Sequence, residues 1–551
     1  MRTRSSTATD GTFLSRWVDG LDFADVVLLA VPFLAIFPLR NNDLWWHLAS
    51  GRAMVERGTF LHGDPFSFTG FMGDWIDNQW LSQLAFYATW WLGGNLGLIV
   101  LRTVLYTAVF FLIRSLVRAG RQPSSLLPCL VVGVALSYGW WEVRPSVFSI
   151  LGTLLLLRIL EEVRRSGRGF AALPVLFVVW ASAHPGFLFG LCILAGTVAA
   201  LYVEPFLSGW PRWTGDSRTA RRLCVWTGVS FLATLANPYG WRVYSEQVSI
   251  AHNAAFRAVL DEWQPPSETF SVFVLLTLGG FIVARYRRVA PAAWIPILGA
   301  AVLATTGVRF QEYFALVAVP AVIVNLGPPR PTSLRTAFVL ALLAGSILVG
   351  LRTPLSVAMP EGRALDAVDR RLAVRIQHNA LFLSMVLTVG LTAAAGRGRN
   401  GHRWLLVHCR GRARLVSVAA ALFLAAVLAW WAPRAGLLPS GYVEPDRYPG
   451  RCLSSLHGEN PRVFNRLSWG GWLIWTLRLP TFIDGRGWGQ PLFLEYQQSH
   501  GPGWRAVFDA HRIGLAIVPK GDVIATELSR APDWQLTCDD AVAVVYRRRN
   551  E

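Results

Sequence analysis

The chain has 551 residues, of which 53% are hydrophobic and only 16% are charged. This composition excludes an ordinary soluble protein and predicts a polytopic membrane protein. The formal net charge of +18 comes from 52 basic residues against 34 acidic ones, and the basic residues other than Lys520 are arginines. These arginines fall in short clusters between apolar runs, as the positive-inside rule produces. No nucleic-acid-binding motif is present, so we expect no nucleic-acid partner.

Residues 1–22 are polar and predict a cytoplasmic tail ahead of a retained first span. Apolar runs near the length of a spanning helix then follow at about 23–39, 95–113, 126–141, 146–163, 171–183, 186–203, 223–236, 269–284, 291–306, 312–327, 336–351, 379–395 and 415–432. They predict a mainly α transmembrane domain over 23–432 with about thirteen spans. With the N-terminus inside, the arginine clusters alternate to the cytoplasmic side, although the arginine-rich loop 352–378 breaks this pattern.

The odd number of spans places the loop 40–80 and the region 433–551 together on the extracytoplasmic side. In that last region the segments PRVFNRL, GGWLIWTL, PTFIDGR, IGLAIVPK and AVAVVYRRR alternate with more helical stretches around 489–511 and 523–531. This pattern predicts a small α/β domain. Cys452 and Cys538 both lie in it, where oxidising conditions permit a disulfide, and sequence alone leaves that bridge open.

The longest polar interruption among the early apolar runs is residues 41–80, which hold four aspartates and two histidines. Directly after Asp43, apolar residues recur at helical spacing and predict a short interfacial helix over 44–57, with Trp45 and Trp46 as membrane anchors. Asp74 and Asp77 are expected to be solvated loop residues.

Six fragments carry a resemblance to a known family: Asp43-Leu44-Trp45-Trp46-His47-Leu48, Asp64-Pro65-Phe66-Ser67-Phe68, His184-Pro185-Gly186, Asn237-Pro238-Tyr239-Gly240, Glu262-Trp263 and Trp469-Gly470-Gly471. In them the chain resembles bacterial membrane proteins related to the GT-C glycosyltransferases. The resemblance implies transfer of a sugar from a polyprenyl-phosphate-linked donor to an envelope glycan, lipid or protein acceptor. It also implies an extracytoplasmic active site in the bacterial inner membrane, in contact with membrane lipid.

In that family an acidic residue of the first outer loop takes the acceptor proton or binds a divalent cation such as Mg²⁺ or Mn²⁺, and Asp43 is the residue that matches. The alternative for Asp43 is a helix N-cap. His47 would share its helix face and orient the carboxylate, or be merely hydrogen-bonded. Asp64 is a second candidate, with turn formation in Asp-Pro as its alternative.

Further candidates fall at the outer ends of predicted spans, where they could converge on one cavity facing the loop 41–80: Glu142, Arg144, His184, Glu262 and Arg309. Arg144 and Arg309 would suit a donor phosphate, because a guanidinium binds phosphate through two parallel hydrogen bonds. Each of these residues has the alternative of a snorkelling interfacial side chain. Trp469, followed later by Asp484-Gly485-Arg486, could stack on a sugar, although core packing is the favoured role.

Two other function classes make different predictions for the sequence. A non-catalytic member of the same architecture would bind lipid-linked glycan or assist envelope assembly. A secondary transporter would show internal repeats and charged or broken helices near mid-membrane, and the sequence shows neither clearly. No phosphate-binding loop, dinucleotide fingerprint or zinc motif is present.

Overall fold

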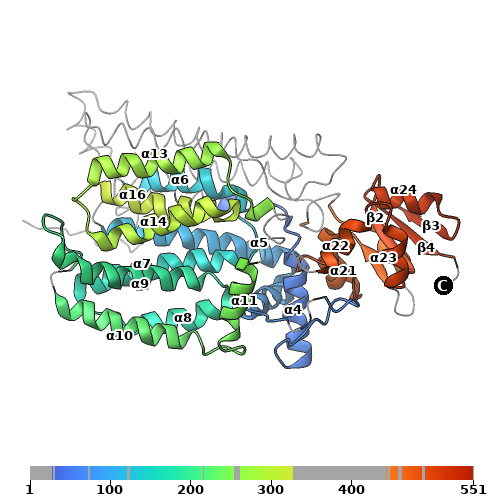
Figure 1. The fold of residues 1–551 in the computed structure, drawn as a ribbon, viewed down its shortest axis with the longest axis horizontal. Coiled ribbons are helices and arrows are strands. Elements are labelled where there is room, and N and C mark those ends of the chain that lie inside the picture. Colours follow the sequence, from blue (N-terminus) through green and yellow to red (C-terminus); the bar gives the residue numbers. More distant parts are fainter. Residues whose placement is uncertain are drawn as a thin grey trace, which may run out of the picture.

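The computed structural model describes residues 28, 31–71, 73, 75–120, 125–214, 216–252, 261–326, 442–443, 447–456, 462–486 and 491–549. The predicted tail, Asp74, the three predicted spans after residue 330 and the loop 352–378 lie outside these residues. The count of thirteen spans and the domain boundary near 432 therefore stay predictions. In the described part, a bundle of helices carries a small sheet at one end (Figure 1).

The helices of the bundle are α3 (Val31–Leu34), α5 (Trp80–Ala119), α6 (Leu126–Ser137), α7 (Ser146–Ser166), α8 (Ala172–Ala183), α9 (Phe187–Val203), α10 (Ser217–Ala233), α13 (Glu268–Arg285), α14 (Pro291–Thr306) and the run of α15 (Gln311–Tyr313), η6 (Phe314–Ala318) and α16 (Val319–Leu326). Every apolar run predicted between residues 95 and 327 falls on one of them. Among the described residues, three helical segments are both long and apolar enough to cross a bilayer: Trp80–Ala119, Phe187–Phe206 and Val308–Leu326.

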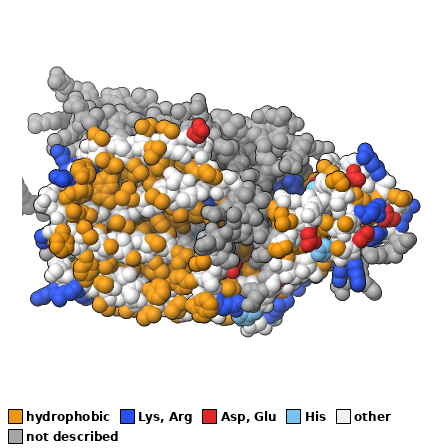
Figure 2. Space-filling model, viewed as in Figure 1, with side chains coloured by type: hydrophobic (Ala, Val, Ile, Leu, Met, Phe, Trp, Pro, Cys, Tyr) orange, Lys and Arg blue, Asp and Glu red, His pale blue; other side chains and the backbone are white. Residues whose placement is uncertain are grey.

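Hydrophobic side chains cover much of the described face of the bundle that Figure 2 shows. Leu92 of α5 and Val283 of α13 are each 78% exposed, which only a hydrocarbon environment makes favourable over so wide a surface. Basic side chains gather at the end of the bundle far from the sheet (Figure 2). Together these features give a mainly α membrane protein.

Helices α4 (Leu44–Arg57) and α11 (Arg242–His252) cross the end of the bundle, between it and the C-terminal residues (Figure 1). The bounds of α4 are those predicted from the spacing of its apolar residues. The prediction that Trp45 and Trp46 anchor it in the membrane is wrong, because both are buried. Trp45 packs edge-on against Tyr448 and Trp472, with ring centroids 5.7 and 4.6 Å away, so protein replaces lipid around α4.

The C-terminal strands β1 (Val463–Asn465), β2 (Leu515–Pro519), β3 (Trp534–Asp539) and β4 (Ala543–Arg548) form one sheet in the order β1-β2-β4-β3. β1 runs parallel to β2, and the other pairs are antiparallel. Helices α22 (Pro491–Gln498), α23 (Trp504–Ala510) and α24 (Val523–Arg530) occupy the stretches predicted to be helical.

One element of this region differs from its prediction. The segment GGWLIWTL, grouped with the extended segments, belongs to helix α21 (Leu467–Leu477). Its apolar residues lie on more than one face, so they hide the helical period. Leu473 and Ile474 are buried in the same core as Leu44 and Leu48 of α4, and this packing decides for the helix.

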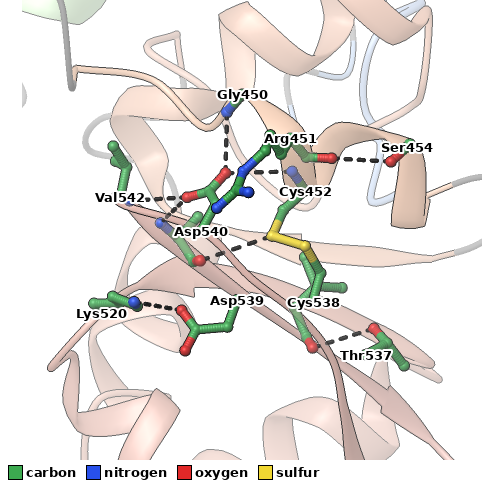
Figure 3. Close-up of a disulfide and its surroundings, with 12 residues drawn as sticks. Gly450, Arg451, Cys452, Ser454, Lys520, Thr537, Cys538, Asp539, Asp540 and Val542 are labelled. Carbon is green, nitrogen blue, oxygen red and sulfur yellow. Dashed lines mark hydrogen bonds and ion pairs between the residues drawn. A yellow bond between two sulfur atoms is a disulfide. The ribbon is translucent and has the colours of Figure 1, made fainter.

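A disulfide joins Cys452 to Cys538, whose Cα atoms are 5.6 Å apart, so the bridge that sequence left open is present (Figure 3). Beside it the Asp540 carboxylate accepts hydrogen bonds from the backbone N–H groups of Gly450, Cys452, Val542 and Ala543, at 3.2, 3.2, 2.8 and 2.7 Å. The bridge and the carboxylate together fasten the segment 447–456 to the edge of the sheet.

Candidate functional site

Asp43 stands at the N-cap position of α4, yet its side chain makes no capping hydrogen bond. Its Oδ2 instead accepts a hydrogen bond from Nη2 of Arg144 at 2.7 Å, and its Oδ1 accepts one from Nε1 of Trp46 at 3.4 Å. The capping alternative therefore does not account for this aspartate. The Asp43 side chain is still 26% exposed, so a substrate group can reach the carboxylate.

Arg144 lies in the turn between η2 (Tyr138–Trp140) and α7, and the same Nη2 also donates to Glu262 Oε1 at 2.9 Å. Glu262 belongs to η4 (Asp261–Trp263), 118 positions along the chain from Arg144. One guanidinium thus joins a carboxylate of the first outer loop to one from a much later loop. Sequence reasoning placed these three residues at one cavity, and the structure brings them into direct contact.

The two carboxylates around Arg144 differ in their acidity. Burial raises the pKa of Asp43, and it outweighs the opposing effect of Arg144, so the pKa of Asp43 lies above its ordinary value. Burial also acts on Glu262, but Arg144 and Arg309 together lower the pKa of Glu262 below its ordinary value. Asp43 is consequently the better proton acceptor of the pair, and Glu262 the more firmly ionised.

His184 follows α8, and its Nδ1 lies 2.6 Å from Ser149 Oγ and 3.1 Å from the N–H of Gly186, which donates to it. Trp180 Nε1 donates to the same serine hydroxyl at 2.8 Å, which leaves that hydroxyl to donate to the imidazole. This pattern puts the proton of the neutral ring on Nε2. Burial, with Arg309 and Arg144 nearby, lowers the pKa of His184 to about 3, so the ring is a neutral donor.

Arg309 is in η5 (Val308–Phe310), next to the loop that carries Glu262. Its guanidinium lies over the ring of Trp263, 4.6 Å from the centroid. Within the described part of the chain it makes no hydrogen bond and no ion pair. An arginine with free N–H groups beside Arg144 and His184 suits an anionic group such as a phosphate.

Two residues predicted to act beside Asp43 lie in other surroundings. His47 is buried, its Nδ1 is 3.5 Å from Gln83 Nε2, and burial lowers its pKa well below the ordinary value. Its ring contacts are with Trp46 and Phe86. These surroundings give His47 a packing environment within the protein, so the role of orienting Asp43 stays a prediction without a contact to support it.

Asp64 is the second such residue. Its Oδ1 accepts from the N–H of Phe66 at 3.0 Å, which is the turn geometry expected of Asp-Pro, and from Arg486 Nη2 at 2.9 Å. Arg486 also binds Asp484 Oδ2 at 2.6 Å, and the three charged side chains are at most 2% exposed. Asp64 thus belongs to a buried ion triad that ties the first outer loop to the C-terminal region.

Trp469 of α21 is 2% exposed, and its Nε1 donates to the backbone oxygen of Arg447 at 3.1 Å. Stacking of a sugar on this ring has no room, whereas core packing, the favoured role, agrees with its burial. The neighbouring glycines explain the motif. A Cβ on Gly470 would lie 2.3 Å from Ile483 O, and one on Gly471 would lie 3.0 Å from Trp46 N.

Binding of a divalent cation is one of the two roles that the family resemblance implies for Asp43. Arg144 already stands between Asp43 and Glu262 and contacts both carboxylates, which is the position that a bridging cation would take. Among the described residues, no three His, Cys, Asp or Glu side chains lie together as a metal-binding group. As arranged here, the residues do not fit a resident cation at Asp43.

Asp77 and Gln83 form a polar contact that sequence reasoning missed. Asp77, expected to be solvated, is 2% exposed, and Gln83 Nε2 donates to its Oδ1 at 2.7 Å. Burial raises the pKa of Asp77 to about 7. The periodicity of the sequence offers no signal for this contact, because Asp77 lies in an irregular loop and is covered only by tertiary packing.

The chain is similar to solved structures rather than to known sequences. No protein-family model and no curated protein matches the chain. The crystal structure of ArnT from Cupriavidus metallidurans bound to undecaprenyl phosphate superposes with a TM-score of 0.54 at 15% identity, covering 95% of this chain and 97% of that one. Its apo form gives 0.53 at 17% identity, covering 97% and 98%. The chain has a GT-C-like fold.

A third similarity is weaker and carries no argument. The Archaeoglobus fulgidus oligosaccharyltransferase reaches a TM-score of 0.48 at 11% identity, covering 92% of this chain and 70% of that one. The GT-C-like fold agrees with the family resemblance read from the sequence fragments, and it spans nearly the whole chain. At these identities the similarity establishes the fold, and the chemistry has to be argued from the residues of the site.

Proposed function

We propose that this protein is a membrane glycosyltransferase that moves a sugar from a polyprenyl-phosphate-linked donor to an envelope glycan, lipid or protein acceptor on the extracytoplasmic side. The observation that carries the proposal is the Asp43 carboxylate, which makes no capping hydrogen bond, pairs with Arg144 beside Glu262 and stays 26% exposed. A carboxylate that only capped α4 would not need an arginine and a second acid around it.

In the proposed reaction Asp43 takes the proton of the acceptor hydroxyl or amide as that group attacks the anomeric carbon. A bond forms between acceptor and sugar, and the bond between sugar and phosphate oxygen breaks, so the polyprenyl phosphate leaves with the bonding electrons. The pKa of the Asp43 carboxyl is raised, which makes Asp43 a stronger base than an ordinary aspartate. Glu262, which stays ionised, fixes Arg144 in place from its other side.

Negative charge that develops on the leaving phosphate is met by Arg309 and by the Nε2–H of neutral His184. Neither forms an ion pair with a described residue, and both are close enough to Arg144 to interact with its charge. Pre-placed donors of this kind stabilise a transition state without reorganising. Arg144 is less available for phosphate than the sequence suggested, since it is already engaged by two carboxylates. ArnT of similar fold was crystallised with undecaprenyl phosphate, which supports a lipid phosphate as the donor class.

The test is transfer of radiolabelled sugar from a panel of polyprenyl-phosphate donors by purified protein, with Asp43→Asn beside the wild type. Loss of a general base predicts a fall in rate of roughly 100- to 10,000-fold with donor binding retained. Arg478→Gln, which removes an exposed ion pair with Glu56, is the matched control for a change of charge and should leave transfer intact. Transfer by Asp43→Asn at the wild-type rate would show that another residue acts as the base. Folded wild-type protein that binds the lipids but transfers nothing would favour a non-catalytic lipid-linked-glycan binder.

A further inference from the structure

The loop Asp484-Gly485-Arg486 brings the C-terminal region into contact with the carboxylate of Asp43. A Cβ placed on Gly485 would lie 2.7 Å from Asp43 Oδ1 and 3.3 Å from Trp46 Nε1. Trp46 Nε1 donates a hydrogen bond to Asp43 Oδ1, so the added Cβ would crowd both partners of this hydrogen bond. The backbone of Gly485 therefore packs against Asp43 Oδ1, the carboxylate oxygen that does not bind Arg144.

Gly485 is required for its small size and not for its backbone conformation. It is not one of the described glycines with a positive φ, so an alanine could adopt the same backbone. A separation of 2.7 Å is shorter than a carbon and an oxygen tolerate. Either the carboxylate or the loop must move when a methyl group is added.

The loop is anchored on both sides of Gly485, so it resists moving. Arg486 donates through Nε to Asp484 Oδ1 at 2.9 Å and through Nη2 to Asp484 Oδ2 at 2.6 Å, a two-pronged pair. Its Nη2 reaches Asp64 as well, and its guanidinium lies 4.8 Å from the ring centroid of Trp75 and 5.0 Å from that of Phe66. Breaking buried pairs of this kind is costly.

Helix α21 supports the loop and α4 from behind. Gly470 lies against the backbone of Ile483 and Asp484, while Gly471 lies against Asn42 and Trp46 at the start of α4. The two neighbouring glycines thus let one helix approach both the loop that carries Gly485 and the turn that carries Asp43. The relative position of these two residues is set by α21.

We propose that Gly485, held by Arg486 and α21, is a positioning residue that confines the Asp43 carboxylate to the orientation facing Arg144. This inference rests on the proposed function for its effect on transfer, whereas the orientation itself can be measured in an inactive protein. The C-terminal region thereby helps to shape the reaction site.

The experiment compares Gly485→Ala with Gly501→Ala, whose added Cβ would meet nothing closer than 3.7 Å and whose φ is likewise not positive. Gly485→Ala should lower kcat about 10- to 100-fold, because a small misplacement of a reacting group is costly. Loss of contact with Arg144 should also raise the pKa of Asp43 further, so the acidic limb of the pH–rate profile moves to higher pH. A merely structural role would not move that limb.

A second readout does not depend on transfer. In an electron-microscopy structure of Gly485→Ala, the distance from Asp43 Oδ2 to Arg144 Nη2 should exceed the 2.7 Å of the native protein. If Gly485→Ala does not fold, Arg486→Lys is used in its place. Lysine keeps the positive charge but cannot make the two-pronged hydrogen bond to Asp484, so Arg486→Lys should shift the acidic limb of the pH–rate profile in the same direction.

The outcomes separate the two proposals. A wild type without transfer from any donor contradicts the proposed function, while the measured Asp43–Arg144 distance in Gly485→Ala still decides the positioning role. Gly485→Ala with the pH profile of Gly501→Ala, or with Asp43 still on Arg144, overturns the positioning role alone. A folded Arg486→Lys variant whose pH–rate profile has an unshifted acidic limb also overturns the positioning role.

Discussion

At the scale of single residues, the site depends on how burial and nearby charges give neighbouring carboxyl groups different pKa values. Asp43 and Glu262 share Arg144, yet the pKa of one is raised and that of the other lowered. The difference arises because Glu262 also has Arg309 as a neighbouring positive charge, while burial dominates at Asp43. Two carboxylates of unequal basicity beside Arg309, which forms no ion pair with a described residue, are an arrangement suited to proton removal next to a phosphate.

The first prediction at this scale concerns pH. If ionised Asp43 is the base, transfer falls as pH drops through its pKa, and because that pKa is raised the fall occurs at a higher pH than for an ordinary aspartate. His184→Gln is the control, since His184 has a pKa of about 3, is neutral at working pH and does not set the limb. A pH–rate profile whose acidic limb disappears in His184→Gln would assign the limb to the histidine.

The second prediction concerns the phosphate. Arg309→Gln should lower kcat/KM for the lipid-linked donor about 10- to 100-fold, the value of one or two hydrogen bonds to a charged group. Inhibition by free polyprenyl phosphate should weaken in parallel, which separates donor binding from acceptor binding. Arg168→Gln, an exposed arginine of the connection between α7 and α8, is the matched control and should behave as the wild type. Equal steady-state parameters for both variants would remove Arg309 from the donor site.

At the scale of elements, two helices decide the geometry. α4 carries Asp43, and α21 packs against α4 and against the loop Asp484-Gly485-Arg486 through adjacent glycines. The buried triad of Asp64, Arg486 and Asp484 fastens the same loop to the first outer loop. Elements from the two ends of the chain therefore form one rigid support for the site.

This support predicts that the two aspartates of the first outer loop behave differently when changed. Asp64→Asn leaves the buried Arg486 with one carboxylate fewer and should destabilise the protein by about 2–4 kcal/mol. Asp43→Asn should lower transfer roughly 100- to 10,000-fold while the melting temperature stays near that of the wild type, because Asp43 is partly exposed. Thermal unfolding and transfer rate measured on both variants check this. Equal melting temperatures for the two would contradict the assignment of Asp64 to structure.

At the scale of the whole molecule, an apolar helical bundle presents the site at one end, next to the small sheet (Figure 1). The basic side chains at the opposite end of the bundle agree with a cytoplasmic face there (Figure 2). In the proposed reaction, a polyprenyl-phosphate-linked donor would reach the site from the bilayer and place its sugar phosphate near Arg309 and Asp43. We propose that this site faces the extracytoplasmic side.

Labelling checks this orientation. In a background without the free cysteines, Arg530→Cys in α24 should react with a membrane-impermeant maleimide in intact cells, because Arg530 is 75% exposed and belongs to the C-terminal region. Arg221→Cys in α10, exposed at the opposite end of the bundle, should react only after lysis. Labelling with the two positions reversed would invert the proposed topology.

The sequence by itself determined the membrane character, the apolar bundle helices between residues 95 and 327, though not α11, and the bounds of α4, because apolar length and 3.6-residue spacing are local properties. It also singled out Asp43, Arg144, His184, Glu262 and Arg309 as candidates. It could not assign Asp64, whose decisive partner Arg486 is 422 positions away, nor foresee the burial of Trp45, Trp46 and Asp77.

Only the tertiary structure decided whether an aspartate beside a helix caps it, binds an arginine or joins a buried triad. The same residue type suits all three roles, and the difference lies in which distant side chains the packing brings within about 3 Å. Asp43 and Asp64 stand in the same loop with similar local signals. Their separate roles follow from Arg144 on one side and Arg486 on the other.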